Sequence, residues 1–386
     1  MAASSGYNNS DVVIVAAGRT PIGNLNGCLS SLKAHELGAM VIRDVLARAR
    51  FLRLTWLKWS WGQDRDRDLP ARAAMNAGIP SSVPAYGVNM LCGSGLKAVA
   101  LGYQAVVCDE SAVIVAGGQE SMSQAPHCCN MRTPLKMGDA KLMDTYAENV
   151  AKQWQVSRDD QDRFAVVSQN RVENSQKEDY FKEEIITVPV KTRKGTTDVT
   201  EDEFPRHGTN MEGLARLKPC FLQDGTGTVT AGNTSGINDG SAAVVLMSYA
   251  EATRRGVVPL ARIVSWGQAG VDPAVMGTGP IPATRKALQK ASWKVEDVDL
   301  FELNEAFAAQ SCAVVKDLGL DPEKVNINGG ALALGHPIGA SGCRILVTLL
   351  YGLNEREQEE AWLLCASVVE WVLLCVWKGY DNNKRT

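Results

Sequence analysis

The sequence has few of the features that mark metal proteins or nucleic-acid-binding proteins. It contains four histidines, and its ten cysteines include no C-x-x-C pair, so it has no pattern typical of a zinc or iron–sulfur site. Forty basic residues nearly balance 43 acidic residues, which argues against a surface for nucleic acid. We therefore expect no bound metal, no nucleic-acid partner, and free thiols in a reducing compartment.

Sequence features of membrane insertion and targeting are also lacking. The apolar run 361–377 carries Glu370 near its middle and is shorter than the roughly 20 residues of a membrane-spanning helix, so it favours a buried strand. Residues 1–10 are polar and resemble neither a signal peptide nor an Arg-rich transit peptide, so we expect a cytoplasmic protein with no membrane contact. The glycine-rich stretch 224–240 lacks the lysine of a P-loop, which argues against a nucleotide-phosphate site of that type.

The sequence does contain an alternation of apolar runs with helical patterns. Continuous apolar runs predict strands buried on both faces, at 11–17, 111–118, 242–247, 261–266 and 298–303. Apolar residues at helical spacing predict helices, at 35–50, 96–107, 281–292 and 345–350. A capping box at Ser157 predicts a further, polar helix over 158–177 with a solvated charged face. The alternation favours an α/β fold with largely parallel sheets.

Cys92 lies where an apolar stretch meets a glycine-flanked turn, just before the predicted helix 96–107. The start of a helix carries unpaired N–H groups and partial positive charge, which favour a thiolate. The neighbouring Gly93 and Gly95 allow a ligand or another backbone to come close. The alternative interpretation is a buried, inert cysteine.

His336 occupies a similar position in the second half, which begins at a composition break near 254–256. In each half a strand leads to a reactive side chain, small residues and an apolar helix, so a faint duplication would make Cys92 and His336 face each other. Such a pair supports nucleophilic catalysis in which the cysteine takes an acyl group. Asn304 follows a predicted strand and would hold an oxyanion-hole water or carbonyl oxygen, with a helix N-cap as the alternative.

Five ordered motifs resemble those of the thiolase family, of the biosynthetic acetyl-CoA acetyltransferase type. They are residues 89–95, 116–123, 233–236, 304–308 and 328–342, and the similarity covers most of 11–50, 73–146 and 147–353. The resemblance implies a duplicated, five-layer αβαβα fold. Its N-terminal half would span 1–253, with an inserted loop domain at about 119–235, and its C-terminal half 254–386.

The resemblance also implies an activity, the condensation of two acetyl-CoA to acetoacetyl-CoA and the reverse thiolysis. Cys92 would carry the acetyl group, His336 would activate it, and Asn304 would orient an oxyanion-hole water. Residues that would contact coenzyme A are Arg206, Thr209 and Ser235. No cofactor is implied beyond the substrates coenzyme A, acetyl-CoA and acetoacetyl-CoA, and a homodimer or homotetramer is expected. A 3-ketoacyl-CoA thiolase of broader chain length is the alternative, less favoured by the match around Met122 and Met276.

Three stretches depart from the family pattern. Residues 51–72 lack the expected strand and glycine-rich loop. The join at 144–145 lacks a segment that covers the pantetheine arm. After Leu353 the expected C-x-G motif is absent. The abrupt edges of the first and third stretches suggest that the reading frame of the gene has been misassigned there, which sequencing the transcript across 50–73 and 353–386 would test.

The second catalytic cysteine of the family, which moves the alpha proton, maps to Cys365. Its spacing to Cys375 equals the spacing of the family's C-terminal cysteines. The glycines that follow in the family are replaced here by Ser367, Val368, Val369 and Trp371, whose side chains would crowd the thioester pocket. A catalytically impaired thiolase-like protein is therefore a further alternative.

Overall fold

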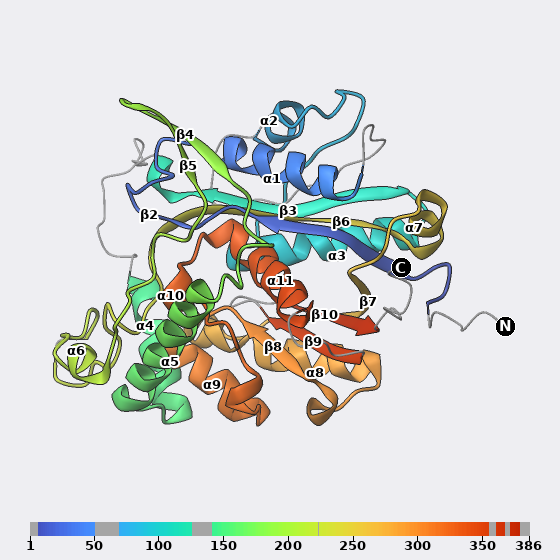
Figure 1. Ribbon diagram of the computed structural model, residues 1–386. Coiled ribbons are helices and arrows are strands. Elements are labelled where there is room, and N and C mark those ends of the chain that lie inside the picture. The colour runs from blue at the N-terminus through green and yellow to red at the C-terminus, as the bar shows by residue number, and fades with distance from the viewer. Residues whose placement is uncertain are drawn as a thin grey trace, which may run out of the picture.

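The computed structural model describes residues 7–50, 69–125, 141–222, 224–354, 360–366 and 371–378, and side chains over 7–50, 70–125, 145–222 and 224–352. Helices and strands alternate in layers (Figure 1). Two helices cover the outer face of the first half of the sheet, α1 (Ala34–Arg48) and α2 (Leu69–Asn76). Two more lie between the halves, α3 (Ser94–Val107) and α11 (Ile338–Asn354). The outer layer of the second half contains α8 (Pro280–Ala291) and α9 (Ala308–Leu318).

The main sheet is continuous through both halves. Its strands follow in the order β2 (Gly23–Asn24), β6 (Asn238–Ser248), β1 (Val12–Arg19), β7 (Ala261–Gln268), β10 (Trp371–Lys378), β9 (Glu360–Ala366) and β8 (Leu300–Leu303), and β3 (Val113–Ser121) pairs with β6. The halves meet where Val13 and Ile14 pair with Arg262 and Ala261. The remaining helices are α4 (Lys141–Trp154), α5 (Arg158–Lys177), α6 (Met211–Ala215), α7 (Tyr249–Arg255) and α10 (Ala331–Leu334), and a separate hairpin contains β4 (Val188–Thr192) and β5 (Gly195–Val199).

The expectation of largely parallel sheets is wrong for the described strands. Strand β6 runs antiparallel to both β1 and β3, and β10 runs antiparallel to both β7 and β9, while β8 and β9 are parallel. A continuous apolar run shows that helices cover both faces of a strand. It does not show whether the strand runs parallel or antiparallel to its neighbours. The strand β6 returns to the sheet only after the long excursion between residues 121 and 238, and local sequence does not record its direction.

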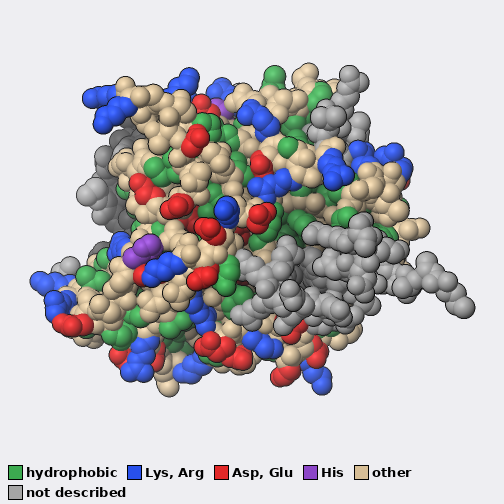
Figure 2. Space-filling view, viewed as in Figure 1, with side chains coloured by type: hydrophobic (Ala, Val, Ile, Leu, Met, Phe, Trp, Pro, Cys, Tyr) green, Lys and Arg blue, Asp and Glu red, His purple; other side chains and the backbone are tan. Residues whose placement is uncertain are grey.

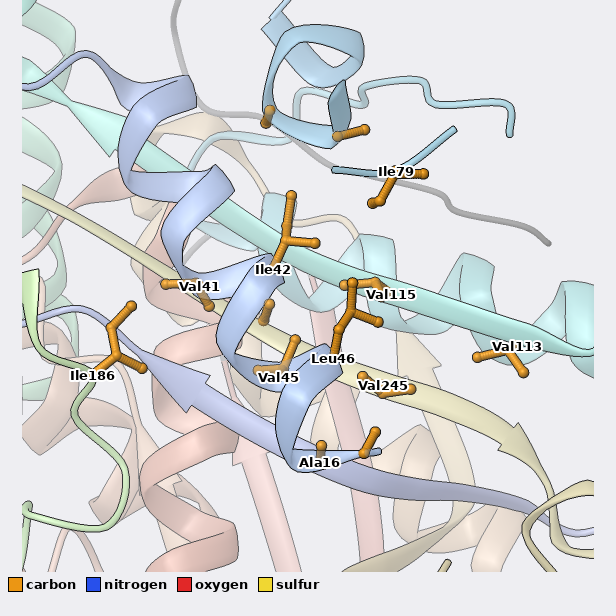
Figure 3. Packing of buried hydrophobic residues seen from close by; sticks show 14 of the residues in the cluster. Ala16, Val41, Ile42, Val45, Leu46, Ile79, Val113, Val115, Ile186 and Val245 are labelled. Carbon is orange, nitrogen blue, oxygen red and sulfur yellow. The ribbon is translucent and has the colours of Figure 1, made fainter. Parts of the chain in front are cut away.

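In the outer layer of the first half, α1 packs its apolar side against the sheet. Its buried residues repeat every three to four positions and pack onto strand residues with which they share no sequence proximity (Figure 3). The residues in contact include Val41, Ile42, Val45 and Leu46 of α1 and Val113, Val115 and Val245 of the sheet. Each fully buried side chain of this size contributes about 1.5–3 kcal/mol.

Glycines allow α3 and α11 to touch in the central layer. A Cβ atom on Gly95 would lie 2.5 Å from the backbone nitrogen of Cys343, and one on Gly342 would lie 2.8 Å from the nitrogen of Leu96. Real Cβ atoms essentially never come this close to backbone. Contact between the two halves therefore depends on these small residues.

The polar helix α5 is less exposed than its composition predicts. Ser157 caps it as expected, because its side chain accepts a hydrogen bond from the Asp160 N–H. Yet Asp162 and Gln169 are buried, and Asp162 accepts hydrogen bonds from Asn233 Nδ2 (2.9 Å) and Arg158 Nε (2.7 Å). The solvated-face prediction thus holds for one side of α5 only, since the other side joins a buried polar network.

Several departures from the family pattern lie outside the described residues, namely 51–68, 355–359 and 367–370. Within the apolar run 361–377, residues 361–366 belong to β9 and residues 371–377 belong to β10, which agrees with the strand prediction. A search of the described helices found none with the length and apolar character needed to cross a membrane. Figure 2 shows acidic and basic side chains interspersed over one face, as the nearly balanced charge predicts.

Candidate active site

Cys92 lies in a single 3-10 turn, Leu91–Gly93, directly before α3. Ser94 folds this turn, because its Oγ accepts from the Met90 N–H (2.8 Å) and donates to the Leu91 carbonyl (2.7 Å). Only 8% of the Cys92 surface is exposed. The prediction that this cysteine stands at a buried helix start is confirmed.

His336 meets Cys92 across the interface of the two halves. The Cys92 Sγ lies 3.0 Å from His336 Nε2, although the residues are 244 positions apart. The backbone N–H of His336 donates to Asn238 Oδ1 (2.8 Å), and Gly335 has a φ of +101°, which suits glycine. A Cβ atom on Gly335 would lie 2.5 Å from the Asn238 side chain. The local backbone thus holds the imidazole in place.

Ser341 determines which ring nitrogen carries the proton. Its Oγ donates to the Pro337 carbonyl (2.9 Å) and lies 2.6 Å from His336 Nδ1. A hydroxyl has one proton, so the Ser341 oxygen accepts a hydrogen bond from Nδ1–H. The neutral ring therefore presents the lone pair of Nε2 to the Cys92 thiol, as a general base requires.

Burial keeps both members of the pair neutral at rest. Desolvation raises the pKa of the Cys92 thiol to about 12, and the nearby Glu120 acts in the same direction. Desolvation lowers the pKa of His336 to about 3, and the Arg344 guanidinium adds to this shift. The expectation that the helix start favours a resting thiolate is therefore wrong, because desolvation outweighs the helix end. The thiolate has to form by proton transfer to His336 during the reaction.

Asn304 borders the imidazole. Its Nδ2 lies 3.4 Å from Nδ1 and 3.5 Å from Nε2 of His336. Its Oδ1 is buried and has no hydrogen-bond partner among the described residues. The N-cap of α9 is Phe307, so the alternative reading of Asn304 as a helix cap is wrong. An amide with one unpaired end beside the imidazole fits the oxyanion-hole role, which stays a prediction.

Cys365 lies in β9, next to β8. Its backbone is level with Glu302 of β8, and the next pair joins Ala366 to Leu303, the residue before Asn304. Neighbouring strands lie about 4.8 Å apart, so this register places Cys365 beside the end of β8 that leads into the site. The position of its side chain lies outside the described atoms, and its proton-transfer role stays a prediction.

The three residues expected to contact coenzyme A lie in two places. The Ser235 N–H donates to the carbonyl of Ala306, which packs against Cys92. Arg206 and Thr209 lie between β5 and α6, where the Thr209 Oγ1 donates to the Arg206 carbonyl (2.6 Å). The exposed Arg206 side chain stacks over Phe204, with its Cζ 5.3 Å from the ring centroid. Of the three residues, only Ser235 therefore lies beside the Cys92 pocket in the described contacts.

Sequence reasoning missed several residues that shape the site. Ser341 and Asn238 fix the imidazole, and the Glu120 Oε2 accepts from the Gly339 N–H (3.0 Å) in the turn after His336. Ser341 stands five positions after His336, a spacing that could have suggested it. Glu120 lies in the motif 116–123, which could have suggested it, whereas Asn238 comes from a distant strand and no local pattern marks it. A search of the described residues found no group of three or more metal-ligating side chains.

Comparisons with known proteins agree with this geometry. The N-terminal domain of thiolase matches residues 12–250 and the C-terminal domain of thiolase matches residues 257–370. The cytosolic acetyl-CoA acetyltransferase of Mus musculus is 53% identical, covering 95% of this chain and 98% of its own length. The acetyl-CoA acetyltransferase of Shinella zoogloeoides is 54% identical, covering 89% and 93% respectively.

Solved structures show the same fold. The acetyl-CoA acetyltransferase of Bacillus anthracis has a TM-score of 0.89 at 38% identity, over 95% of this chain and 98% of its own. Human mitochondrial 3-ketoacyl-CoA thiolase also has a TM-score of 0.89, at 36% identity, over 96% and 100% respectively. The expected five-layer fold is thereby confirmed. With a buried cysteine–histidine pair between two matched domains, the chain belongs to the thiolase family.

Proposed function

We propose that this protein is an acetyl-CoA C-acetyltransferase, which condenses two acetyl-CoA to acetoacetyl-CoA and catalyses the reverse thiolysis. The observation that carries the proposal is the 3.0 Å contact between Cys92 Sγ and the unprotonated Nε2 of His336. A nucleophile within reach of a base whose orientation a third group fixes is the arrangement that covalent acyl transfer needs. The names of relatives at 53–54% identity support the same activity.

In the first half-reaction the Cys92 proton moves to His336 Nε2 as the sulfur attacks the acetyl-CoA carbonyl. The C–S bond to coenzyme A breaks, and the departing coenzyme A thiolate takes the proton from His336. The products are acetyl-Cys92 and free coenzyme A. His336 begins and ends this half-reaction neutral, because it passes the Cys92 proton on to coenzyme A.

In the second half-reaction a base removes an alpha proton from a second acetyl-CoA. The resulting carbanion attacks the acetyl-Cys92 carbonyl, the bond between that carbonyl and the Cys92 sulfur breaks, and the Cys92 thiolate takes up the proton that the base removed. The register of β9 beside β8 supports Cys365 as that base. The Asn304 amide and His336 are close enough together to bind the oxygen on which charge develops.

Contacts to coenzyme A are assigned to Arg206, Thr209 and Ser235. The hydrogen bond from Ser235 to Ala306, next to Cys92, supports a role near the thioester. Arg206 is exposed on the loop domain, where a cation can reach a phosphate of coenzyme A. No other cofactor is required by this chemistry.

The alternative of a broader 3-ketoacyl-CoA thiolase is less well supported. The relative with that name is 36% identical, whereas the acetyl-CoA acetyltransferase of Mus musculus is 53% identical. A non-catalytic protein would have no need of the tight Cys92–His336–Ser341 chain.

Thiolysis of acetoacetyl-CoA by the purified chain tests the proposal, with Cys92→Ser as the variant. We expect acetyl-CoA to form at a rate that the variant lowers by at least about a thousandfold. Mass spectrometry should find an acetyl group on Cys92 of the wild type. An active Cys92→Ser variant would overturn the assignment of the nucleophile. Acetylation of Cys92 without condensation would instead show that Cys365 is not the second base.

We also infer that the protein is a homo-oligomer of the cytosol and that it acts in lipid metabolism. We place the boundary between its two halves at residues 253 and 254. The word cytosolic in the name of the Mus musculus relative supports the location. Light scattering on the purified chain tests the oligomer, and a monomer at micromolar concentration would refute it.

A further inference from the structure

Tyr146 lies close to the candidate active site but has no role in the chemistry proposed above. It belongs to α4, directly after the short join at 144–145, and only 2% of its surface is exposed. It packs in an apolar cluster that also contains Met276 and Phe307. A buried aromatic ring near a reacting cysteine can exclude part of the acyl group that the cysteine carries.

Phe307 connects Tyr146 to the nucleophile. One apolar cluster contains Cys92, Ala306, Phe307 and Ile338, and the cluster of Tyr146 contains Phe307 as well. The rings of Tyr146 and Phe307 meet edge to face, with centroids 5.2 Å apart and planes at 82°. A thiolate at Cys92 would raise the pKa of the Tyr146 phenol, so the two groups lie within electrostatic range.

The two sides of Cys92 differ in polarity. His336 and Asn304 form the polar side, where the carbonyl oxygen of a thioester finds hydrogen-bond partners. Ala306, Phe307 and Ile338 form the apolar side. The carbon chain of an acyl group on the sulfur therefore points toward Phe307, and beyond Phe307 stands Tyr146.

The Tyr146 ring has little room to withdraw. A Cβ atom added to Gly277 would lie 3.1 Å from Tyr146 Cε2 and 2.7 Å from Gln310 Cγ, so the ring is packed closely against the backbone at Gly277 with Gln310 alongside. Gln310 comes from α9, on which α4 packs. A longer acyl chain would have to displace this packing.

We propose that Tyr146 is a specificity-determining residue that closes the acyl pocket of Cys92 and restricts the acyl group to about two carbons. The inference rests on the proposed function and names its substrate class as short 3-ketoacyl thioesters. A rigid aromatic wall discriminates by size, because each excess methylene in a filled pocket is worth about 10–200-fold in kcat/KM.

The experiment compares thiolysis of acetoacetyl-CoA with thiolysis of 3-ketohexanoyl-CoA, which leaves a four-carbon group on Cys92. We expect the wild type to prefer acetoacetyl-CoA. Tyr146→Ala should raise the ratio of kcat/KM for the longer substrate to that for the shorter by at least about tenfold. Tyr146→Leu, which leaves less empty volume, should shift the ratio in the same direction by a smaller factor. Tyr146→Phe keeps the ring and should leave the ratio unchanged.

Phe181→Ala is the matched control, because Phe181 is a buried aromatic residue in a separate apolar cluster. It should lower stability without changing the ratio. An unchanged ratio in both Tyr146→Ala and Tyr146→Leu would overturn the proposal. A wild type that neither cleaves acetoacetyl-CoA nor acylates Cys92 would instead refute the proposed function, so the two failures are distinguishable.

Discussion

Ser341 is the residue on which the protonation state of the site depends. It fixes the proton of His336 on Nδ1, so Nε2 is free to take the Cys92 proton. Ser341→Ala should leave the ring free to adopt the other tautomer and should lower kcat by about tenfold to a hundredfold. The pH profile of kcat/KM should also move, which a merely structural role would not produce. Ser341→Thr keeps the hydroxyl and should restore most of the activity; equal loss in both variants would contradict this role.

The buried imidazole makes stability depend on pH. His336 titrates near 6.5 in an unfolded chain and near 3 in the folded protein. Below pH 6.5, His336 binds a proton in the unfolded state but not in the folded state. The free energy of unfolding therefore falls as the pH drops from 6.5 toward 3. At pH 5 the loss from this residue is on the order of 2 kcal/mol.

Urea unfolding at pH 7.5 and pH 5 measures this effect. His336→Gln carries no titrating ring and should lose less stability than the wild type between the two pH values. The same loss in both proteins would show that His336 is not the group responsible. The comparison between proteins cancels the contributions of the other titrating groups.

At the scale of elements, a buried ion cluster ties β1 to the segment that follows β5. The Arg19 guanidinium contacts Asp202 at 2.7 and 2.9 Å and Glu184 at 2.6 Å, and the Asp202 Oδ1 also accepts from the Ile22 N–H. All three charged side chains are buried. Burial makes such a cluster costly to break, since a charge left without its partner has no water to replace it.

Asp202→Asn should therefore destabilise the protein by about 3–5 kcal/mol. The matched control is Asp159→Asn, because Asp159 pairs with Arg163 on the surface, where the side chains are 56% and 70% exposed. That pair should contribute less than about 1 kcal/mol. Urea unfolding of both variants checks the prediction, and similar losses would contradict it.

At the scale of the whole molecule, the site exists only where the two halves meet. Cys92 belongs to the turn before α3 and His336 to the turn before α11, and these helices touch through Gly95 and Gly342. The proposed chemistry is thus a property of the contact between halves. Small changes in helix separation should appear as lost activity.

Gly95→Ala tests this dependence. Its new Cβ would lie 2.5 Å from the Cys343 nitrogen, whereas an ordinary contact needs 3.4–4 Å, so α3 must move away from α11. We expect a loss of about 1–3 kcal/mol in stability and a larger proportional loss of thiolysis. Gly270→Ala is the control, because no atom lies within 4 Å of its added Cβ. Full activity in Gly95→Ala would show that the helix contact does not position the pair.

The sequence by itself determined several of the elements and pointed to the candidate reacting pair. Local periodicity was enough for β1, β3 and α1, because apolar spacing reports directly on burial. The cap of α5 at Ser157 needs only three neighbouring residues. Cys92, His336 and Asn304 stood out because each lies in an ordered motif, and resemblance carried the interpretation further than spacing could.

Tertiary structure alone decided how those pieces act together. The antiparallel course of β6, the contact between Cys92 and His336 and the wall at Tyr146 all depend on contacts between residues distant in sequence. The neutral resting thiol of Cys92 depends on burial, which outweighs the local effect of a helix start. Desolvation and close approach are properties of the packed molecule, and no local pattern of residues records them.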